Sequence, residues 1–419
     1  MTLLLPPLLS LGAALMGCLS SPTQAQETPQ CTELTGARVW TPKGVVQQTV
    51  VLAGERIVQV GEQRAAGWGG GDCVSVDLSA HLLTPGLIDS QSSVGLVEVS
   101  AEHGAHRSGG RPAVEVVWDY NPQSVVVQST RHHGVTAAIL TGRGQWSGAM
   151  GLVELGGATL NQAVVQPAVA QGFRLGHPAT DLLTLSEILA DVDAYRADPR
   201  AHARGESREY LLPPADLLAL QPVADGRVPL VVTVNKASHI EALLAWHAEH
   251  PKLRLVLSGA SEAWVHAQAL AQADIAVILN PQVQSAESFH TLQGRPDNAA
   301  LLAQAGVAVI IASSSGHEGR ELTQLAGLAV RAGMDHSQAL AALTQTPAQV
   351  FGLEGQGALR PGARANLVAW TGDPLELRTR AAAVWIAGEQ QALVGRQELL
   401  MERYSQPEPP TLTPVFREP

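Results

Sequence analysis

The chain has 419 residues, of which 45% are hydrophobic and 16% charged, and its net charge is −11. This length is enough to bury the core of one barrel-sized domain together with a small accessory domain. The acidic balance and the absence of a basic cluster argue against a nucleic-acid partner, and the 40 glycines argue for many short loops in a globular chain.

The N-terminal residues differ in composition from the rest of the chain. Residues 3–17 form an apolar run that two prolines interrupt and a polar stretch follows. The run is too short to span a bilayer, so we interpret residues 1–25 as a secretory signal peptide that is cleaved after Ala25. Residues 15–18 also fit a loose lipobox, so lipid attachment at Cys18 is an alternative, as is retention of the uncleaved segment as an anchor. We therefore expect a periplasmic or secreted protein without any other membrane span.

Once this segment is removed, two cysteines remain, Cys31 and Cys73. An oxidising compartment favours disulfides. Because both cysteines fall in the same small N-terminal region, we expect them to be bonded to each other. The alternative is two separate buried thiols.

Short valine-rich runs separated by turn residues fill positions 36–82, and they predict strands without a helix. Next comes an apolar run at 82–90 that has an aspartate, Asp89, close to its end and is expected to be one strand. From about residue 130, apolar strands alternate with helical segments; the strands are expected at 134–140, 228–235, 253–258, 274–280 and 306–314. Continuously apolar strands of this kind predict a parallel sheet covered by helices. The number of units favours a closed (β/α)8 barrel over a doubly wound sheet.

The C-terminal part returns to β-type patterns over residues 365–395. We expect it to pair with the N-terminal strands in one composite β-sandwich that brackets the barrel. The Pro-rich stretch from residue 402 predicts an extended tail. The expected organisation is therefore a signal peptide (1–25), the N-terminal part of the sandwich (26–82), the barrel (83–355), the C-terminal part of the sandwich (356–400) and a tail (401–419).

The Pro-Gly-Leu-Ile-Asp motif at residues 85–89 and two further segments, at residues 54–62 and 342–370, resemble the amidohydrolase superfamily, specifically its exported imidazolonepropionase-like branch. The Pro-Gly-Leu-Ile-Asp motif at residues 85–89 is similar to the first barrel strand of that family. Residues 54–62 are similar to its N-terminal sheet, and residues 342–370 to its last helix and the return to that sheet, with Asn366 where an aspartate is usual. The resemblance implies an α/β fold, a TIM-like (β/α)8 barrel with a composite β-sandwich. It also implies hydrolysis of C–N bonds at a divalent metal, usually Zn²⁺, held at the carboxyl ends of the strands.

The side chains that hold this metal in the family are replaced here. The family's His-x-His pair after the first strand corresponds to Gln91 and Ser93, and its fifth-strand ligand positions correspond to Thr233 and Asn235. None of these four side chains is an imidazole or a carboxylate, the ligands that Zn²⁺ takes beside water.

The later positions follow the same trend. The histidine that ends the family's sixth strand corresponds to Ser258 or Gly259, and the aspartate that ends the eighth strand corresponds to Ser314 or a neighbour. The lysine that is carboxylated in some members corresponds to Arg174, which stays protonated and cannot form a carbamate. With all of these positions changed, we expect no catalytic metal centre of the usual kind.

Other residues offer alternatives to a metal-free site. His103 and His106 lie after the first strand, and His317 lies after the eighth. They are the weak candidates for an atypical zinc site, and solvated loop histidines are the simpler interpretation. Lys236 follows the fifth strand, where it could act as a nucleophile or bind an anion, in a metal-independent lyase or isomerase. A lysine directed to solvent is the simpler interpretation there.

We therefore expect an exported pseudoenzyme of the amidohydrolase type without a cofactor. Its partners would be a small-molecule ligand, and an intact amidohydrolase paralogue or a second copy of the same chain. The expected pocket residues are Gln91, Ser93, Asn235, Lys236 and Ser314. The alternative is an active hydrolase of C–N bonds, in cyclic amides or dipeptides, that uses an atypical metal site.

Overall fold

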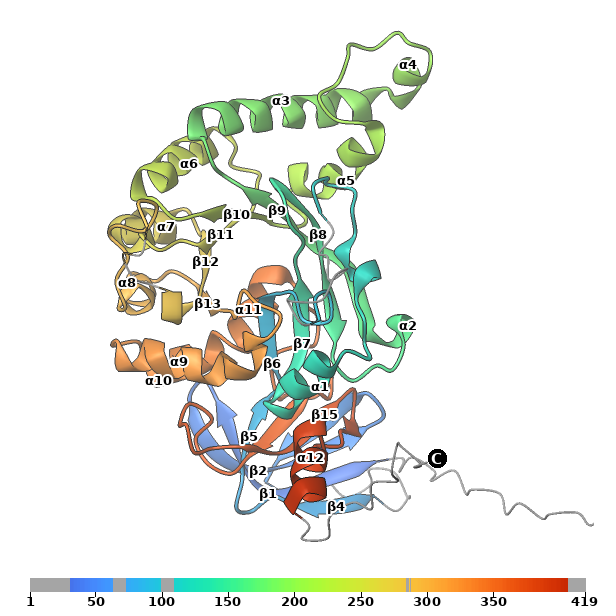
Figure 1. Cartoon of the computed structure of the whole chain (residues 1–419), viewed down its shortest axis with the longest axis vertical. Helices are drawn as coiled ribbons and strands as arrows, with labels where there is room; N and C mark the ends of the chain where they lie inside the picture. The colour runs from blue at the N-terminus through green and yellow to red at the C-terminus, as the bar shows by residue number, and fades with distance from the viewer. Residues whose placement is uncertain (1–30, 63–72, 99–108, 284–285, 287, 406–419) are drawn as a thin grey trace, which may run out of the picture.

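The computed structural model describes residues 31–62, 73–98, 109–283, 286 and 288–405. Two eight-stranded sheets organise this part of the chain, a composite sheet at the bottom of Figure 1 and a barrel sheet above it. No helix within these residues is long and apolar enough to cross a membrane. The predicted signal peptide, His103 and His106, and the tail from residue 406 lie outside the described residues.

The composite sheet joins the two ends of the described chain. The N-terminal segment contributes β1 (Thr32–Thr41), β2 (Gly44–Ala53), β3 (Arg56–Gly61), β4 (Val74–Asp77) and β5 (Leu82–Pro85). The C-terminal segment contributes β14 (Leu367–Trp370), β15 (Ala381–Ile386) and β16 (Glu389–Gln390). Hydrogen bonding runs continuously in the order β16-β15-β14-β5-β1-β2-β3, and β4 pairs with β1. The junction of the two segments is the antiparallel pair β5–β14, so the blue and red strands of Figure 1 form one composite domain.

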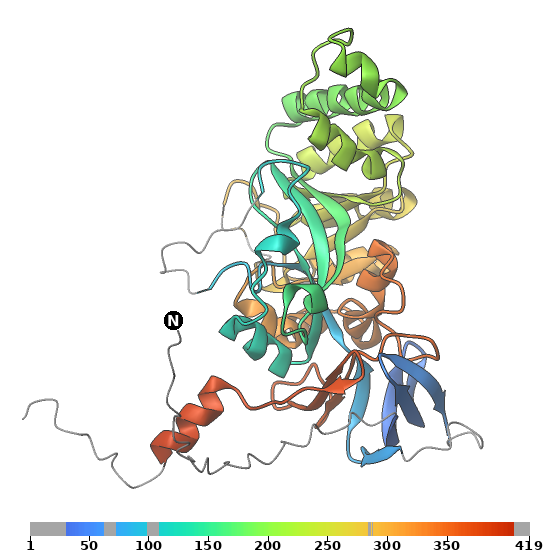
Figure 2. The ribbon, with the colours of Figure 1, turned by 90° about the vertical axis from the view of Figure 1, so that its right-hand side faces the viewer.

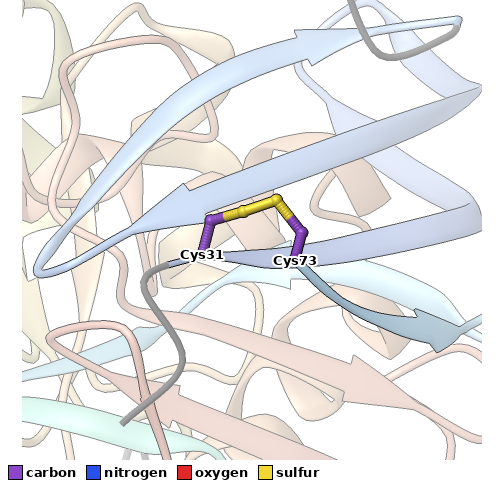
Figure 3. The surroundings of a disulfide bond; sticks show 2 residues. All are labelled: Cys31 and Cys73. Atoms are coloured by element: carbon purple, nitrogen blue, oxygen red, sulfur yellow. A yellow bond between two sulfur atoms is a disulfide. The ribbon is translucent and has the colours of Figure 1, made fainter. Parts of the chain in front are cut away.

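A disulfide fastens two of these strands at their amino ends. Cys31 directly precedes β1, and Cys73 directly precedes β4. The two strands pair in parallel with Thr32 opposite Val74, which places the cysteines side by side. A disulfide joins Cys31 to Cys73, as Figure 3 shows.

The apolar run at 82–90 is two strands that belong to different sheets. It divides at Gly86 into β5 of the composite sheet and β6 (Leu87–Ser92) of the barrel. A side chain could not fit at Gly86, because a β-carbon there would lie 2.1 Å from Oγ1 of Thr136. The barrel therefore begins at residue 87, and residues 83–85, which were expected in the barrel, pair with β14 and β1 instead.

The barrel sheet contains eight strands in chain order. They are β6, β7 (Val135–Leu140), β8 (Trp146–Glu154), β9 (Val164–Arg174), β10 (Leu230–Val234), β11 (Leu255–Gly259), β12 (Ala276–Leu279) and β13 (Val309–Ile311). β13 lies next to β6, so the sheet nearly closes into a barrel. It departs from a strict (β/α)8 barrel at β8, which is antiparallel to both neighbours. The chain turns directly from β7 into β8 without a helix between them, which forces this reversal.

Helices cover the outer side of the parallel strands (Figure 1). They are α1 (Val125–His132), α3 (Pro178–Ala197), α4 (Pro199–Ala203), α5 (Pro214–Ala224), α6 (Ala237–Glu249), α7 (Ala267–Gln272), α8 (Asn298–Gln304), α9 (Leu322–Arg331), α10 (His336–Ala341) and α11 (Gln345–Phe351). The short α2 (Leu160–Ala163) links β8 to β9, and the 3-10 turns are η1 (Val116–Asp119), η2 (Ala263–His266), η3 (Pro281–Val283) and η4 (Glu318–Glu321). Strand residues alternate between an outer core under these helices and an inner core that contains Ile139, Val231, Ile278 and Ile310, with Phe351 of α11 packed among them. Burial on both faces explains why the strands are continuously apolar.

A buried polar cluster connects β8 to the composite domain. Glu154 is 2% exposed, and its carboxylate accepts hydrogen bonds from Arg364, Gln356 and Asn366 at 2.7–3.1 Å. Asn366 donates from Nδ2 to Glu154 at 2.8 Å while its Oδ1 accepts from the Ala387 amide. An aspartate at position 366 would place a second carboxylate against Glu154, so the amide suits this neighbour.

The C-terminal segment ends in a helix where an extended tail was expected. Helix α12 (Arg396–Ser405) includes residues 402–405 and projects from the composite domain, as Figure 2 shows. The proline-rich sequence that indicated an extended chain begins only after this helix, and it lies outside the described residues.

Candidate functional site

Side-chain alternation places a ring of polar residues above the inner core. Val231 of β10 belongs to that core, so Thr233 and Asn235, two and four positions later, lie on the same inward face. The same step leads from Val256 to Ser258 on β11, and from Ile278 to Asn280 after β12. The carboxyl ends of the parallel strands therefore surround a polar mouth, the location of active sites in barrel enzymes.

This mouth is a cavity of about 540 Å³. It is lined by Gln91, Thr141, Gly142, Ser147, Arg174, Thr233, Asn235, Ser258, Gly259, Ser261, Asn280, Ser288, Thr291 and Ser314. The positions that the resemblance matches to metal ligands thus come together in one cavity, with Ser93 as the exception. The residues that sequence reasoning missed include Thr141 and Asn280, although each directly follows an apolar strand and could have been found by that signal.

Hydrogen bonds connect three strands across this cavity. Oε1 of Gln91 accepts from Oγ of Ser258 at 2.6 Å and from Oγ of Ser314 at 3.4 Å. Ser314 has a φ of 56°, a left-handed conformation that L residues rarely adopt. This conformation at the end of β13 accompanies the contact of Ser314 with Gln91 and is typical of strain kept at functional sites.

The β10 and β11 ends are joined in a similar way. Oδ1 of Asn235 accepts from Oγ of Ser261 at 3.3 Å. Gly259 has a φ of 79°, and a β-carbon on it would lie 2.7 Å from Oδ1 of Asn235. Glycine at this position therefore leaves the room that the Asn235 amide occupies.

Two predicted pocket residues lie outside the cavity lining. Among the described residues, Ser93 and Lys236 are not part of that lining. Ser93 is buried at 5% exposure. Lys236 is the residue before α6, where the chain has left the β10 ladder and turned into the helix, so it lies at the rim. Burial and the charges of Lys236, His290 and His177 lower the pKa of the nearby His239, so three histidines accompany Lys236 at this rim.

The buried Asp89 supports the mouth from outside the cavity. Its carboxylate is fully buried and accepts hydrogen bonds from the backbone amide of Ser313 at 3.0 Å and from the Ser313 hydroxyl at 2.5 Å. A β-carbon on Gly319 would lie 3.4 Å from its Oδ2, which places this oxygen on the side of η4. Burial raises the pKa of Asp89 to about 6, although the hydrogen bonds from Ser313 act in the opposite direction. The contact joins β6 to the end of β13.

The histidine proposed for an atypical metal site faces a different space. His317 is exposed and lines a cavity of about 510 Å³ beside α1 and α9, together with His132 and His133. Among the described residues, no group of three or more His, Cys, Asp or Glu side chains is placed to hold a metal ion. In the mouth itself, the lining offers amides, hydroxyls and one guanidinium. This donor set does not fit Zn²⁺, which takes imidazole, thiolate and carboxylate ligands.

Comparisons with known proteins agree with this fold. The amidohydrolase family model matches residues 260–395. An amidohydrolase from Thermotoga maritima MSB8 is 20% identical with a TM-score of 0.76, over 86% of this chain and 99% of that one. A prolidase complexed with N-methylphosphonate-L-proline is 15% identical with a TM-score of 0.56, over 86% and 99% of the two chains. A β-aspartyl dipeptidase from Fervidobacterium islandicum AW-1, in complex with a β-Asp-Leu dipeptide, is 15% identical with a TM-score of 0.53, over 87% and 96%.

The comparison with curated proteins gives no match. The predicted fold class and the resemblance to the amidohydrolase superfamily are both confirmed, by the family model over residues 260–395 and by the shared fold over most of the chain. This protein is thus an amidohydrolase-fold barrel with a composite β-domain, and its residues 260–395 match the sequence model of the amidohydrolase family.

Proposed function

We propose that this protein is an exported pseudoenzyme of the imidazolonepropionase-like branch that binds a small polar molecule in the barrel mouth without a catalytic metal. The observation that carries the proposal is the composition of the cavity. Every position that the resemblance matches to a metal ligand and that lines the cavity holds an amide, a hydroxyl, a glycine or a guanidinium, namely Gln91, Arg174, Thr233, Asn235, Ser258, Gly259 and Ser314.

The chemistry of these side chains supports binding in place of metal catalysis. Oε1 of Gln91 already accepts the Ser258 hydroxyl at 2.6 Å, and amide and hydroxyl oxygens are poor ligands for Zn²⁺. A dication in the mouth would also be repelled by the permanent charge of Arg174. Amides and hydroxyls both donate and accept hydrogen bonds, which suits them to orient a polar ligand. A cavity of about 540 Å³ lies in the size range of small-molecule sites.

Export and assembly are further parts of the proposal, supported by the sequence alone. The apolar N-terminal segment supports secretion to the periplasm or beyond, with lipid attachment as the alternative. A pseudoenzyme could assemble with an intact amidohydrolase paralogue or with a second copy of this chain. Affinity purification from the native compartment tests this part, which fails if the chain elutes as a monomer without a partner.

The metal content of the full chain, purified from its native compartment, tests the central claim. We expect elemental analysis to find far less than one transition metal per chain, and we expect a chelator to leave the thermal midpoint unchanged. The same preparation is assayed for hydrolysis of an Xaa-Pro dipeptide and β-aspartyl-leucine, because structural neighbours include a prolidase and a β-aspartyl dipeptidase.

About one tightly held metal per chain, with chelator-sensitive hydrolysis, would refute the proposal and favour the atypical site of His103, His106 and His317. In that case His317→Ala should lower the metal content. His336→Ala, which removes an exposed histidine elsewhere, is the matched control.

A further inference from the structure

The barrel mouth contains one fixed positive charge. Arg174 ends β9, and it is the one charged side chain among the described residues that line the cavity; the others are amides, hydroxyls and glycines. The chain as a whole has a net charge of −11, so this charge is opposite in sign to that of the molecule.

Two carboxylates near this mouth are already engaged by backbone amides. Oδ2 of Asp181 accepts from the amides of Gly176 and His177 at 2.7 and 2.8 Å. Glu262, which is 4% exposed, accepts from the amides of Ala237 and Gln293 at 2.8 and 2.9 Å. None of the ion pairs among the described residues involves Arg174, so its five N–H donors are available for a ligand.

The backbone that carries Arg174 is held in place from two sides. The Arg174 amide donates to the carbonyl of Gln145 at 2.7 Å, and Nε2 of Gln145 donates to Oδ1 of Asp181 at 3.1 Å. Asp181 is 8% exposed, and its other oxygen fixes the turn at residues 176–177. Phe173 packs on Trp146 with ring centroids 4.8 Å apart. These contacts fix the backbone from which the Arg174 side chain extends, so the ligand does not have to order this strand end on binding.

Further basic side chains lie close in sequence to residues of the cavity lining. His177, Lys236, His239 and His290 interact electrostatically at the rim, and Asp181 opposes their charge. Burial and Lys236 lower the pKa of His239, which disfavours the charged form of this histidine. Lys236 therefore adds positive charge at the rim, while Arg174 provides it in the cavity.

We infer that the cavity binds a small monocarboxylate that also carries hydroxyl or amide groups, with the guanidinium of Arg174 as the receptor of the carboxylate. This inference rests on the proposed function and names its ligand class. The planar fork of arginine matches a carboxylate with two parallel hydrogen bonds. The surrounding amides and hydroxyls provide donors and acceptors for the rest of the ligand. Carboxylate and phosphate both accept hydrogen bonds through negatively charged oxygens. The single cation in the cavity balances one negative charge, which favours a carboxylate over a phosphate dianion.

Matched pairs of probes test the inference on the full chain. Calorimetric titrations would compare three acids, D-gluconate, N-acetylglycinate and N-acetyl-L-glutaminate, each with the corresponding primary amide. Inorganic phosphate would be titrated as a further probe. At least one acid should bind about 10- to 100-fold more tightly than its amide, the contribution expected of hydrogen bonds to a charged group. Arg174→Gln should abolish this preference and Arg174→Lys should retain part of it. Arg331→Gln, which removes the same charge from the exposed end of α9, should leave it intact.

Several outcomes would overturn the inference. These are acids that bind no better than their amides, a preference that survives in Arg174→Gln, binding of none of the acids, or phosphate that binds more tightly than every acid. Circular dichroism and thermal midpoints of each variant show whether a loss of binding comes from unfolding. Metal content separates the two proposals: a metal-free chain without acid preference refutes the inference alone, whereas a stoichiometric metal with hydrolysis refutes the proposed function.

Discussion

Replacing Asp89 by asparagine should remove a specific pH dependence from the stability of the barrel. The carboxyl group is fully buried, and burial raises its pKa from the ordinary value of 3.8 to about 6. Between these values the folded chain holds a proton that the unfolded chain has released. The group therefore stabilises the fold fully below about pH 4, and this contribution is lost as the pH rises through about 6. Each pKa unit corresponds to 1.36 kcal/mol, so the rise of the pKa from 3.8 to about 6 amounts to ~3 kcal/mol in the free energy of unfolding.

Urea unfolding of the wild type and Asp89→Asn at several pH values between 4 and 8 measures this difference. Asparagine keeps an oxygen that can accept the Ser313 amide, and it cannot ionise. Relative to the variant, the wild type should therefore lose ~2.4 kcal/mol between pH 4 and 7, because a part of the ~3 kcal/mol is already lost at pH 4. Asp119→Asn, at an exposed position, controls for the removal of a carboxylate. If the free energy of unfolding changed with pH in the same way for the wild type and Asp89→Asn, the argument would be refuted. Asp89 would then have the same pKa in the folded and the unfolded chain.

Three further changes have defined outcomes. Replacing Cys31 and Cys73 by serine opens a cross-link between positions 42 residues apart and should lower the free energy of unfolding by ~4 kcal/mol; an unchanged urea midpoint would contradict this. Glu154→Gln leaves Arg364 without its buried partner and should destabilise the fold by about 3 kcal/mol in thermal or chemical unfolding, a result that a well-tolerated variant would disprove. Lys236→Gln should slow the association of D-gluconate in stopped-flow measurements and reduce its salt dependence. If Lys236 were instead a nucleophile, borohydride would trap a substrate on it, and the variant would lose turnover.

The sequence predicted the parallel strands of the barrel and many residues of its mouth. Both predictions depend on regular patterns, namely apolar strands that alternate with helices and side chains that alternate between the two faces of a strand. Each apolar strand is buried on both faces, so its hydrophobic pattern alone locates it. The same alternation explains why Asn235 lies in the cavity and Lys236 does not. Asn235 has the inward parity of Val231, whereas Lys236 follows it at the turn into α6. The sequence motif placed both residues at the strand end, and only the geometry of the turn separates them.

Other features could not be predicted because they depend on contacts between distant segments. The division of residues 82–90 at Gly86 follows from the approach of Thr136, and an apolar run carries no trace of that approach. The reversal of β8 follows from the short connection after β7, and the burial pattern of β8 does not reveal it, because β8 is buried along almost its whole length like β7. The sequence comparison matched Arg174 to a lost metal ligand. That Arg174 forms no ion pair with Asp181 could not be predicted, because it depends on the backbone amides that bind the Asp181 carboxylate in the folded chain.

The pairing of β5 with β14 has a consequence for the order in which the chain can fold. The indole of Trp370 donates to the hydroxyl of Thr84 across 286 positions of sequence, and the backbone ladder beside this bond connects the same two segments. A nascent chain cannot complete the composite sheet until almost all of it has been synthesised, so the edge of β5 stays unpaired while the barrel strands emerge. Contacts of such long range form slowly, because the entropy of closing the loop must be overcome first. For the exported protein proposed above, late closure would keep the chain for longer in the open state that a secretion channel accepts.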